Sequence, residues 1–283
     1  MIEILKAIIY GIVEGITEWL PISSTGHLIL VEQLIPFTGT SEDFFGMFDV
    51  VIQLGAILAV VVLFWKQIWP FALTAKERAG KTGAVSFIKM DIMTLWFKIL
   101  VSCVPAAIIG ILFDEVFEAL FYNSVCIAIA LIVFGVAFII IENWNKGRNA
   151  KVNSLSEITY QTALLIGVFQ LIAAIFPGTS RSGATIVGAL LIGVSRTVAA
   201  EYTFFLAIPV MFGASLLKVF KFGLNFSALE LTLLIIGTVV SFVVSIVVLR
   251  FLMSYIKKHD FKVFGWYRIV LGIIVLLYFG VLA

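Results

Sequence analysis

The sequence predicts an all-α polytopic membrane protein that contains an inverted-topology repeat, with two re-entrant broken helices and about six transmembrane helices. Of its 283 residues, 62% are hydrophobic and only 13% are charged, whereas a soluble domain is about 25% charged. Several apolar runs approach the ~20 residues that an α-helix needs to cross a bilayer. Two further apolar segments are each interrupted by proline and small polar residues. This composition excludes secreted disulfide scaffolds, and the net charge of +2 gives no reason to expect a nucleic-acid partner.

The elements follow in order along the chain. Residues 4–36 are apolar but broken by Pro21-Ile-Ser-Ser-Thr-Gly26, which predicts two short helices that meet at a tip. Residues 158–195 are broken in the same way by Pro177-Gly-Thr-Ser-Arg-Ser-Gly183. The full spans are expected at about 48–65, 96–113, 119–141, 201–219, 229–250 and 264–282.

Basic residues give the orientation of these spans. Lysines and arginines gather in 66–98, where Lys76, Arg78 and Lys81 lie, and in 142–157 and 250–262, which predicts that these segments are cytoplasmic. Residues 32–49 lack Lys and Arg, and an acidic turn is expected at 114–118, so both are read as external. The predicted cytoplasmic and external segments alternate along the chain only if each broken segment enters and leaves the membrane on the same side.

The first broken segment would then enter from the external side and the second from the cytoplasmic side, so the two halves are inverted relative to each other. We expect one integral membrane domain over 1–283, with repeat halves of about 1–150 and 151–283. Gly11, Pro21, Ser24 and Val31 recur about 156 positions later as glycine, proline, serine and valine. Inverted repeats with broken helices place a polar site where the tips meet near the bilayer midplane. Tryptophans close to the predicted span boundaries are interpreted as interfacial anchors, namely Trp19, Trp65, Trp69, Trp96 and Trp266.

Ionisable residues at membrane depth are costly and therefore indicate function. Glu14 and Glu18 stand i, i+4 on the first half-helix, and because their charges repel, a cation is expected close by. The alternative is an external amphipathic helix with solvated carboxylates. Downstream of Pro21, Ser24 and His27 stand i, i+3, so that the imidazole is placed to take a hydroxyl proton. The alternative is that Ser23 or Ser24 is a helix N-cap and His27 an interior histidine.

The second tip supplies a cation. Arg181 is flanked by Ser180, Ser182 and Thr185 and by glycines that allow close approach of a ligand. A guanidinium among hydroxyls is typical of a phosphate site, since arginine binds phosphate through two parallel hydrogen bonds. A structural ion pair between Arg181 and Glu18 is the alternative. Gln53 either lines the same cavity or packs between helices.

These residues together resemble a known family. Glu14-x-x-x-Glu18 running into Leu20-Pro-Ile-Ser-Ser-Thr-Gly-His27, with Pro-Gly-x-Ser-Arg-Ser-x-x-Thr at 177–185, is similar to the bacterial undecaprenyl pyrophosphate phosphatases, also called bacitracin-resistance proteins. The resemblance implies hydrolysis of the terminal phosphate of the C55 isoprenoid diphosphate to the monophosphate carrier used in cell-wall synthesis. It also implies a bacterial cytoplasmic membrane protein whose site opens to the external side, and a divalent cation, Mg²⁺ or Ca²⁺.

Phosphoanhydride hydrolysis needs charge neutralisation, a nucleophile and a proton source. We expect Arg181 to bind the diphosphate, Ser24 to attack, and His27 to act as base and then acid. Glu18 either orients His27 or, with Glu14, holds the metal ion. Attack by water or by His27 itself stays open. The remaining substrate-binding residues are expected to be Ser23, Thr25, Gln53, Ser180, Ser182 and Thr185.

A rival from another class is a transporter of an anionic lipid or solute, which uses the same architecture. It explains Arg181 but not the convergence of a histidine, a hydroxyl and two carboxylates. Membrane phosphatases of the phosphatidic-acid type need a second motif with histidine and aspartate, and this chain has only His27 and His259. The expected partners are the isoprenoid diphosphate and the membrane. The sequence leaves the choice between monomer and homodimer open.

Overall fold

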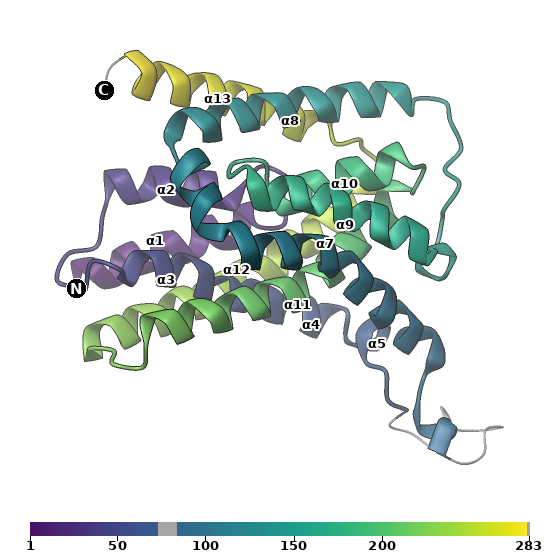
Figure 1. Ribbon diagram of the computed structural model, residues 1–283, viewed down its shortest axis with the longest axis horizontal. Helices are drawn as coiled ribbons and strands as arrows, with labels where there is room; N and C mark the ends of the chain where they lie inside the picture. Colours follow the sequence, from purple (N-terminus) through teal and green to yellow (C-terminus); the bar gives the residue numbers. More distant parts are fainter. Residues whose placement is uncertain (73–83, 282–283) are drawn as a thin grey trace.

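A computed structural model describes residues 1–72 and 84–281. Within these residues the chain forms α-helices joined by loops and two short 3₁₀ turns, and most of the helices run along the long axis of the molecule (Figure 1). The basic residues Lys76, Arg78 and Lys81 lie outside the described residues. The first half contains α1 (Ile2–Thr17), α2 (Ser24–Leu34), α3 (Phe44–Val51), α4 (Gln53–Leu63), α5 (Trp65–Ile68), η1 (Ala84–Phe87), α7 (Met90–Phe121) and α8 (Ser124–Trp144). The second half contains η2 (Leu155–Glu157), α9 (Tyr160–Ile175), α10 (Arg181–Leu191), α11 (Arg196–Phe222), α12 (Ala228–Ile256) and α13 (Lys262–Val281).

The six predicted spans are confirmed. Among the described residues, six helical segments are long and apolar enough to cross a membrane. They are Phe44–Leu63, Met90–Gly110, Ser124–Trp144, Arg196–Phe222, Ala228–Ile256 and Lys262–Phe279. Most begin earlier or end later than the hydrophobic runs suggest, because helices continue through residues such as Arg196 and Lys262 at their ends. The protein is therefore a multi-pass α-helical membrane protein.

The predicted acidic turn at 114–118 is wrong. These residues lie inside α7, which continues to Phe121. Acidic residues do not break a helix by themselves, and no glycine or proline stands between Pro105 and the end of α7 except Gly110. The chain reverses instead at Tyr122 and Asn123, where the Asn123 side chain caps α8 by accepting a hydrogen bond from the Cys126 N–H at 2.9 Å.

Both predicted broken segments consist of two short helices separated by a tip. The helices before the tips, α1 and α9, have 16 residues each, and those after them, α2 and α10, have 11 each. The residue before the second helix is a serine with positive φ in both, Ser23 at 76° and Ser180 at 70°. Such backbone is rare for non-glycine residues, so both tips are locally strained.

Each of these serines is a helix N-cap. The Ser23 side chain accepts from the Gly26 N–H, and the Ser180 side chain accepts from the Gly183 N–H. Ser23, and not Ser24, thus occupies the place that Ser180 has in the second tip, which shifts the expected correspondence by one residue. The inverted relation of the two halves stays a prediction.

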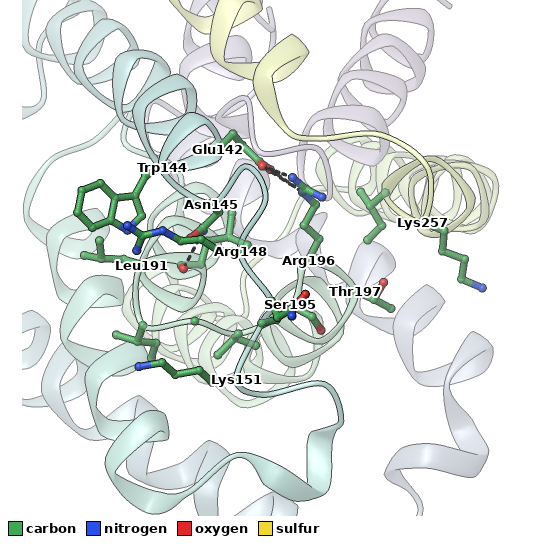
Figure 2. Close-up of a pocket in the computed structure, with 17 residues that line it drawn as sticks. Glu142, Trp144, Asn145, Arg148, Lys151, Leu191, Ser195, Arg196, Thr197 and Lys257 are labelled. Carbon is green, nitrogen blue, oxygen red and sulfur yellow. Dashed lines mark hydrogen bonds and ion pairs between the residues drawn. The ribbon is translucent and has the colours of Figure 1, made fainter.

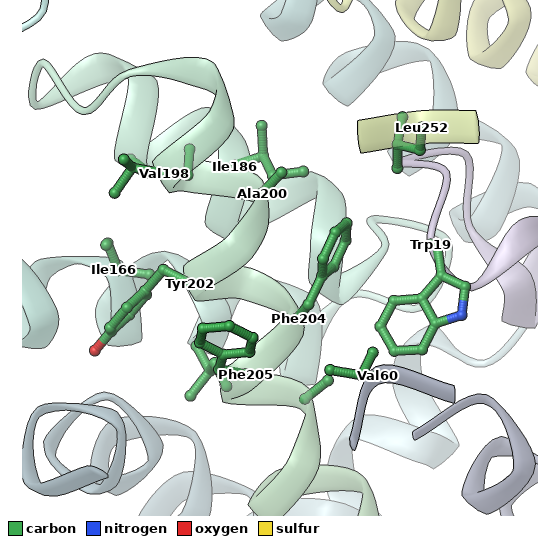
Figure 3. Close-up of a cluster of buried hydrophobic side chains, with 14 of the residues drawn as sticks. Trp19, Val60, Ile166, Ile186, Val198, Ala200, Tyr202, Phe204, Phe205 and Leu252 are labelled. Atoms are coloured by element: carbon green, nitrogen blue, oxygen red, sulfur yellow. The ribbon is translucent and has the colours of Figure 1, made fainter. Parts of the chain in front are cut away.

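The main hydrophobic core packs directly behind the first tip (Figure 3). Trp19 is fully buried there, with its ring centroid 5.2 Å from that of Phe204 in α11. The prediction that Trp19 anchors the chain at the membrane interface is therefore wrong, because the return of the chain after α1 carries it inward. Trp65 and Trp266 are exposed, at 40% and 59%. The core fixes the first tip against α11, the helix that begins just beyond α10.

Candidate active site

The two tips meet at one cavity of about 460 Å³. Ser23 and Thr25 line it from the first tip, and Ser180 and Arg181 line it from the second. Gln53, at the start of α4, also lines the cavity, as expected. Segments more than 150 residues apart in sequence therefore form one cavity, as the sequence predicted. The expected site residues Glu14, Glu18, Ser24 and His27 are not among those that line it, whereas two carboxylates that the sequence did not single out, Glu32 and Asp49, are.

A carboxylate joins the tips behind Arg181, the residue through which it meets the cavity. Glu18 Oε1 accepts from Arg181 Nη2 at 2.6 Å, and Glu18 Oε2 accepts from Ser24 Oγ at 2.6 Å. Glu18 and Ser24 are buried, and the Arg181 side chain is 14% exposed. The cation expected beside the two glutamates is thus Arg181. This same contact is the ion pair on which the alternative, purely structural interpretation rests.

The helix boundaries explain why these three groups converge. Glu18 follows the last residue of α1 as its C-cap, so its side chain stands at the first tip. Ser24 and Arg181 are each the first residue of a helix, α2 and α10. The N–H groups of a first helical turn have no partners within the helix, and this end of the helix dipole favours negative charge. Two helix N-termini and a guanidinium therefore surround a single carboxylate, an arrangement suited to anionic groups.

His27 is held differently from the expectation. Its Nδ1 lies 2.7 Å from the Ser23 carbonyl oxygen, and its Nε2 lies 2.7 Å from the Tyr267 hydroxyl. Ser24 donates to Glu18 instead of to His27, because a charged carboxylate is the stronger acceptor. A shared helical face does not by itself produce a Ser–His hydrogen bond. Tyr267 in α13, 240 residues from His27, was not anticipated, and a lone sequence offers no signal for it.

The remaining hydroxyls divide into two groups. Ser180 lines the cavity, and its Oγ lies 3.1 Å from that of Ser182. Ser182 is buried and contacts the Glu18 carbonyl oxygen at 3.3 Å. Thr185 is also buried, donating to the Arg181 carbonyl oxygen at 2.9 Å and accepting from Thr203. Neither Ser182 nor Thr185 is among the residues that line the cavity, so both support Arg181 from behind.

Glu14 is the group that most needs a counter-ion. It is fully buried one turn before Glu18, and neither of its carboxylate oxygens has a hydrogen-bond partner among the described residues. No cluster of three His, Cys, Asp or Glu side chains that could hold a metal ion occurs in the described part of the chain. A Mg²⁺ site here would therefore consist of Glu14 and Glu18 with water and phosphate oxygens, which is a common arrangement for Mg²⁺.

Arg268 is a residue of the site that the sequence reasoning missed. It is fully buried in α13, and its Nη2 donates to the carbonyl oxygens of Gly178 at 2.9 Å and Thr179 at 2.6 Å. Its Nη1 donates to the Pro21 carbonyl oxygen at 3.2 Å. One guanidinium thus holds both tips. The signal was present, because a lone arginine inside the apolar run 264–282 is costly at membrane depth.

Gly178 shows how closely the second tip is packed. Its φ is 87°, and a Cβ built on it would lie 2.6 Å from the Ile127 carbonyl oxygen in α8. Only glycine meets both conditions. Lys218 of α11 also lines the cavity and is a second cation that the sequence did not single out.

Comparison with known proteins identifies the family of this chain. A family model described as bacitracin resistance protein BacA matches residues 7–274. The undecaprenyl-diphosphatase of Desulfitobacterium hafniense is 64% identical over 280 residues, covering 99% of this chain and 97% of the relative. Undecaprenyl-diphosphatase 1 of Clostridium acetobutylicum is 63% identical and covers 98% of each chain, and an undecaprenyl-diphosphatase of Enterococcus faecalis is 62% identical over 98% and 97%. The chain belongs to the BacA family of bacitracin resistance proteins.

Proposed function

We propose that this protein removes the terminal phosphate of undecaprenyl diphosphate, leaving the monophosphate lipid. The observation that carries the proposal is that Arg181, which lines a cavity formed by both tips, shares one carboxylate, Glu18, with Ser24. The name undecaprenyl-diphosphatase, which the close relatives bear, supports the substrate. Removing this phosphate regenerates a lipid carrier, which links the activity to cell-wall synthesis and bacitracin resistance.

Binding of the diphosphate follows from the charges. Arg181 already uses Nη2 for Glu18, and its Nη1 donates to the Thr203 carbonyl oxygen at 3.3 Å. A phosphate in the cavity competes with Glu18 for the guanidinium and takes over part of its hydrogen bonding. Ser23, Thr25, Ser180 and Gln53 supply further polar atoms around the cavity. The substrate thereby draws Arg181 towards itself and leaves the Glu18 carboxylate to Ser24.

The reaction then has a nucleophile and a proton acceptor in contact. Ser24 Oγ attacks the terminal phosphorus, its proton passes to Glu18, and the bond to the bridging oxygen breaks to release undecaprenyl phosphate. Water then cleaves the phosphoserine to give inorganic phosphate. His27, held by Ser23 and Tyr267, is the group proposed for proton transfer to the leaving oxygen, although it is not among the residues that line the cavity. Direct attack by water or by His27 is the competing route.

A divalent cation fits the acidic side of the site. As the alternative to accepting the Ser24 proton, Glu18 would hold Mg²⁺ or Ca²⁺ together with Glu14, and the ion would neutralise charge on the diphosphate when bound. Glu14 contributes a buried carboxylate without a hydrogen-bond partner among the described residues. The protein's own part is to keep this carboxylate dehydrated and close to Glu18.

The lipid and the membrane side follow from the surroundings of the cavity. Its apolar wall includes Ile29, Phe117 and Tyr122, and a volume of about 460 Å³ suits the polar head and not a 55-carbon chain, which lies in the bilayer.

The basic loops 142–157 and 250–262 lie at the far end of the molecule (Figure 1). By the positive-inside rule the cavity opens to the external side of the bacterial cytoplasmic membrane.

The test is phosphate release from a short-chain isoprenoid diphosphate by the purified protein in detergent with Mg²⁺. Wild-type protein and a Lys258→Ala control, altered at an exposed lysine in a basic loop, should release phosphate equally, and Arg181→Ala should lose most of the activity. A protein that releases no phosphate but moves a labelled anionic lipid across vesicles would be the transporter, and the proposal would be wrong.

A further inference from the structure

A second cavity, of about 420 Å³, lies at the other end of the molecule (Figure 2). It is built where α8 and α10 end, where α11 begins and where α12 ends. Arg181 begins α10 and Leu191 ends it, so the two cavities are separated by the length of that helix, about 15 Å at 1.5 Å per residue. Lys218 of the first cavity and Arg196 of the second are about 30 Å apart along α11 by the same rule. The second cavity is therefore distinct from the proposed active site.

Cations dominate its lining. Figure 2 shows Arg148 and Lys151 to one side and Arg196 and Lys257 to the other, with Glu142 as the only carboxylate among the lining residues. Glu142 is already neutralised, because both of its oxygens accept from Arg196 Nε, at 2.9 and 3.0 Å. It also accepts from the Phe261 N–H at 3.0 Å. No second carboxylate lines the cavity beside Arg148 and Lys151. Lys257 interacts with Glu201 and Arg196 with Asp260, and neither of these two carboxylates is a lining residue.

Two of the cations are held in place. Glu142 is buried and fixes Arg196, whose Nη1 makes no hydrogen bond within the described residues. The Arg148 guanidinium lies 4.1 Å from the centroid of the Trp144 ring, a cation–π contact that limits its motion. Fixed guanidinium groups bind anions well because little side-chain entropy remains to be lost.

The backbone adds donors on the same side. Ser195 is the N-cap of α11, but its side chain makes no capping hydrogen bond. Ser195, Arg196 and Thr197 all line the cavity, so the N-terminus of a 27-residue helix, whose first N–H groups have no partners within the helix, forms part of its wall. Hydroxyls, backbone N–H groups and guanidinium groups around a concave site are the donors that phosphate requires.

We propose that this cavity binds a phosphate group, carried either by free inorganic phosphate or by the head group of an anionic phospholipid. By the positive-inside rule it lies on the side of the membrane opposite the active site. The proposal does not depend on the reaction at the tips. It assigns a role to a basic cluster that is too far from the tips to touch the diphosphate.

The experiment compares two pairs of charge-neutralising variants on the same two loops. Lys151→Gln with Lys257→Gln removes two cations that line the cavity. Lys146→Gln with Lys258→Gln removes two exposed lysines that do not line it. Both pairs are made in the Arg181→Ala background, so that phosphate bound at the tips does not contribute. Arg196 is left unchanged, because its removal would leave Glu142 buried without a partner.

Two measurements separate the sources of the phosphate. Calorimetric titration with inorganic phosphate at constant ionic strength tests the free ion. Native mass spectrometry of protein from mixed phosphatidylglycerol and phosphatidylcholine micelles tests the head group. We expect binding in one of the two assays to weaken by about tenfold in the cavity pair and to stay unchanged in the control pair. Equal loss in both pairs, or no binding in either assay, would overturn the proposal.

Discussion

Arg181 Nη2 and Ser24 Oγ both donate to the carboxylate of Glu18, each at 2.6 Å, although 163 residues separate Arg181 from Glu18. The first helical residues of α2 and α10 are thereby coupled through a single side chain. A ligand that draws Arg181 away removes one of the two donors from the carboxylate that contacts Ser24. Phosphate binding and activation of the nucleophile are therefore expected to be linked.

The first prediction concerns the guanidinium. Arg181→Lys should lose nearly as much activity as Arg181→Ala, because an ammonium cannot make two parallel hydrogen bonds to phosphate. The expected loss is about 10²-fold or more, as for removal of one oxyanion donor. Initial rates of phosphate release measure it. A lysine variant within a few-fold of wild type would make Arg181 a distant electrostatic contributor.

The second prediction identifies the unit to which Ser24 belongs. Ser24→Ala and Glu18→Gln should each lose most of the activity, and the double variant should be little worse than either, since residues that act together are non-additive. Adding His27→Ala to Ser24→Ala tests the competing pair. If only the histidine combination is non-additive, His27 and not Glu18 accepts the serine proton.

A control distinguishes this from a purely structural ion pair. Were Glu18 and Arg181 to serve stability alone, either single variant would lower the melting temperature strongly, and replacing both by uncharged residues would restore it and the activity together. We expect the double variant to remain inactive whatever its stability. Phosphate release by a Glu18→Gln, Arg181→Gln protein at the wild-type rate would support the structural role.

The third prediction concerns Tyr267, which contacts His27 Nε2 at 2.7 Å. Tyr267→Phe removes only this hydroxyl, so the ring packing against His27 is kept. One lost hydrogen bond of about 1 kcal/mol corresponds to a roughly fivefold lower kcat with little change in KM. Steady-state kinetics in detergent measure both constants. An unchanged kcat would show that the Tyr267 hydroxyl does not position His27 for the reaction.

The sequence predicted the architecture because membrane insertion has simple requirements. Length and hydropathy locate the spans, and a proline followed by a run of small polar residues locates both tips. The sequence could not predict which residue caps the helix that follows each tip. Ser23 and Ser24 are adjacent serines of equal propensity, and only the positive φ of Ser23 makes it the cap and leaves the Ser24 hydroxyl for Glu18.

Contacts between distant helices were also beyond the sequence. Tyr267 and Arg268 come from α13, and nothing local to residues 21–27 or 177–185 indicates that α13 packs there. Arg268 still carried a readable cue, since a buried arginine in a span requires partners. The position of Trp19 near a helix end was misleading, because aromatic residues at helix ends occur both at membrane interfaces and in buried cores.

The fourth prediction separates function from stability at Glu14. Glu14→Gln replaces a buried carboxyl group that has no hydrogen-bond partner among the described residues, so the fold should be unchanged or more stable. Activity should fall on the order of 10²-fold, and the Mg²⁺ concentration needed for half-maximal rate should rise. Melting temperature and a Mg²⁺ titration of the rate are the measurements. A destabilised variant with unchanged Mg²⁺ dependence would assign Glu14 to structure.

The fifth prediction concerns the guanidinium that holds the two tips. Arg268→Met leaves the carbonyl oxygens of Pro21, Gly178 and Thr179 without this donor. Unsatisfied buried groups cost about 1–3 kcal/mol each, and relief from burying a charge offsets part of that cost, so a net loss on the order of 3 kcal/mol is expected. The melting temperature in detergent should fall, and phosphate release should fall with it.

Two comparisons make this result specific to the tips. Arg250→Met, at an exposed position of α12, removes the same charge and should leave stability and rate unchanged. Gly178→Ala keeps Arg268 but forces a Cβ to within 2.6 Å of the Ile127 carbonyl oxygen at a φ of 87°, so it should separate the second tip from α8 and reproduce the loss of activity. If Arg268→Met retained the wild-type melting temperature and rate while Gly178→Ala lost both, the tips would be held by backbone packing against α8, and the buried guanidinium would not be what joins them.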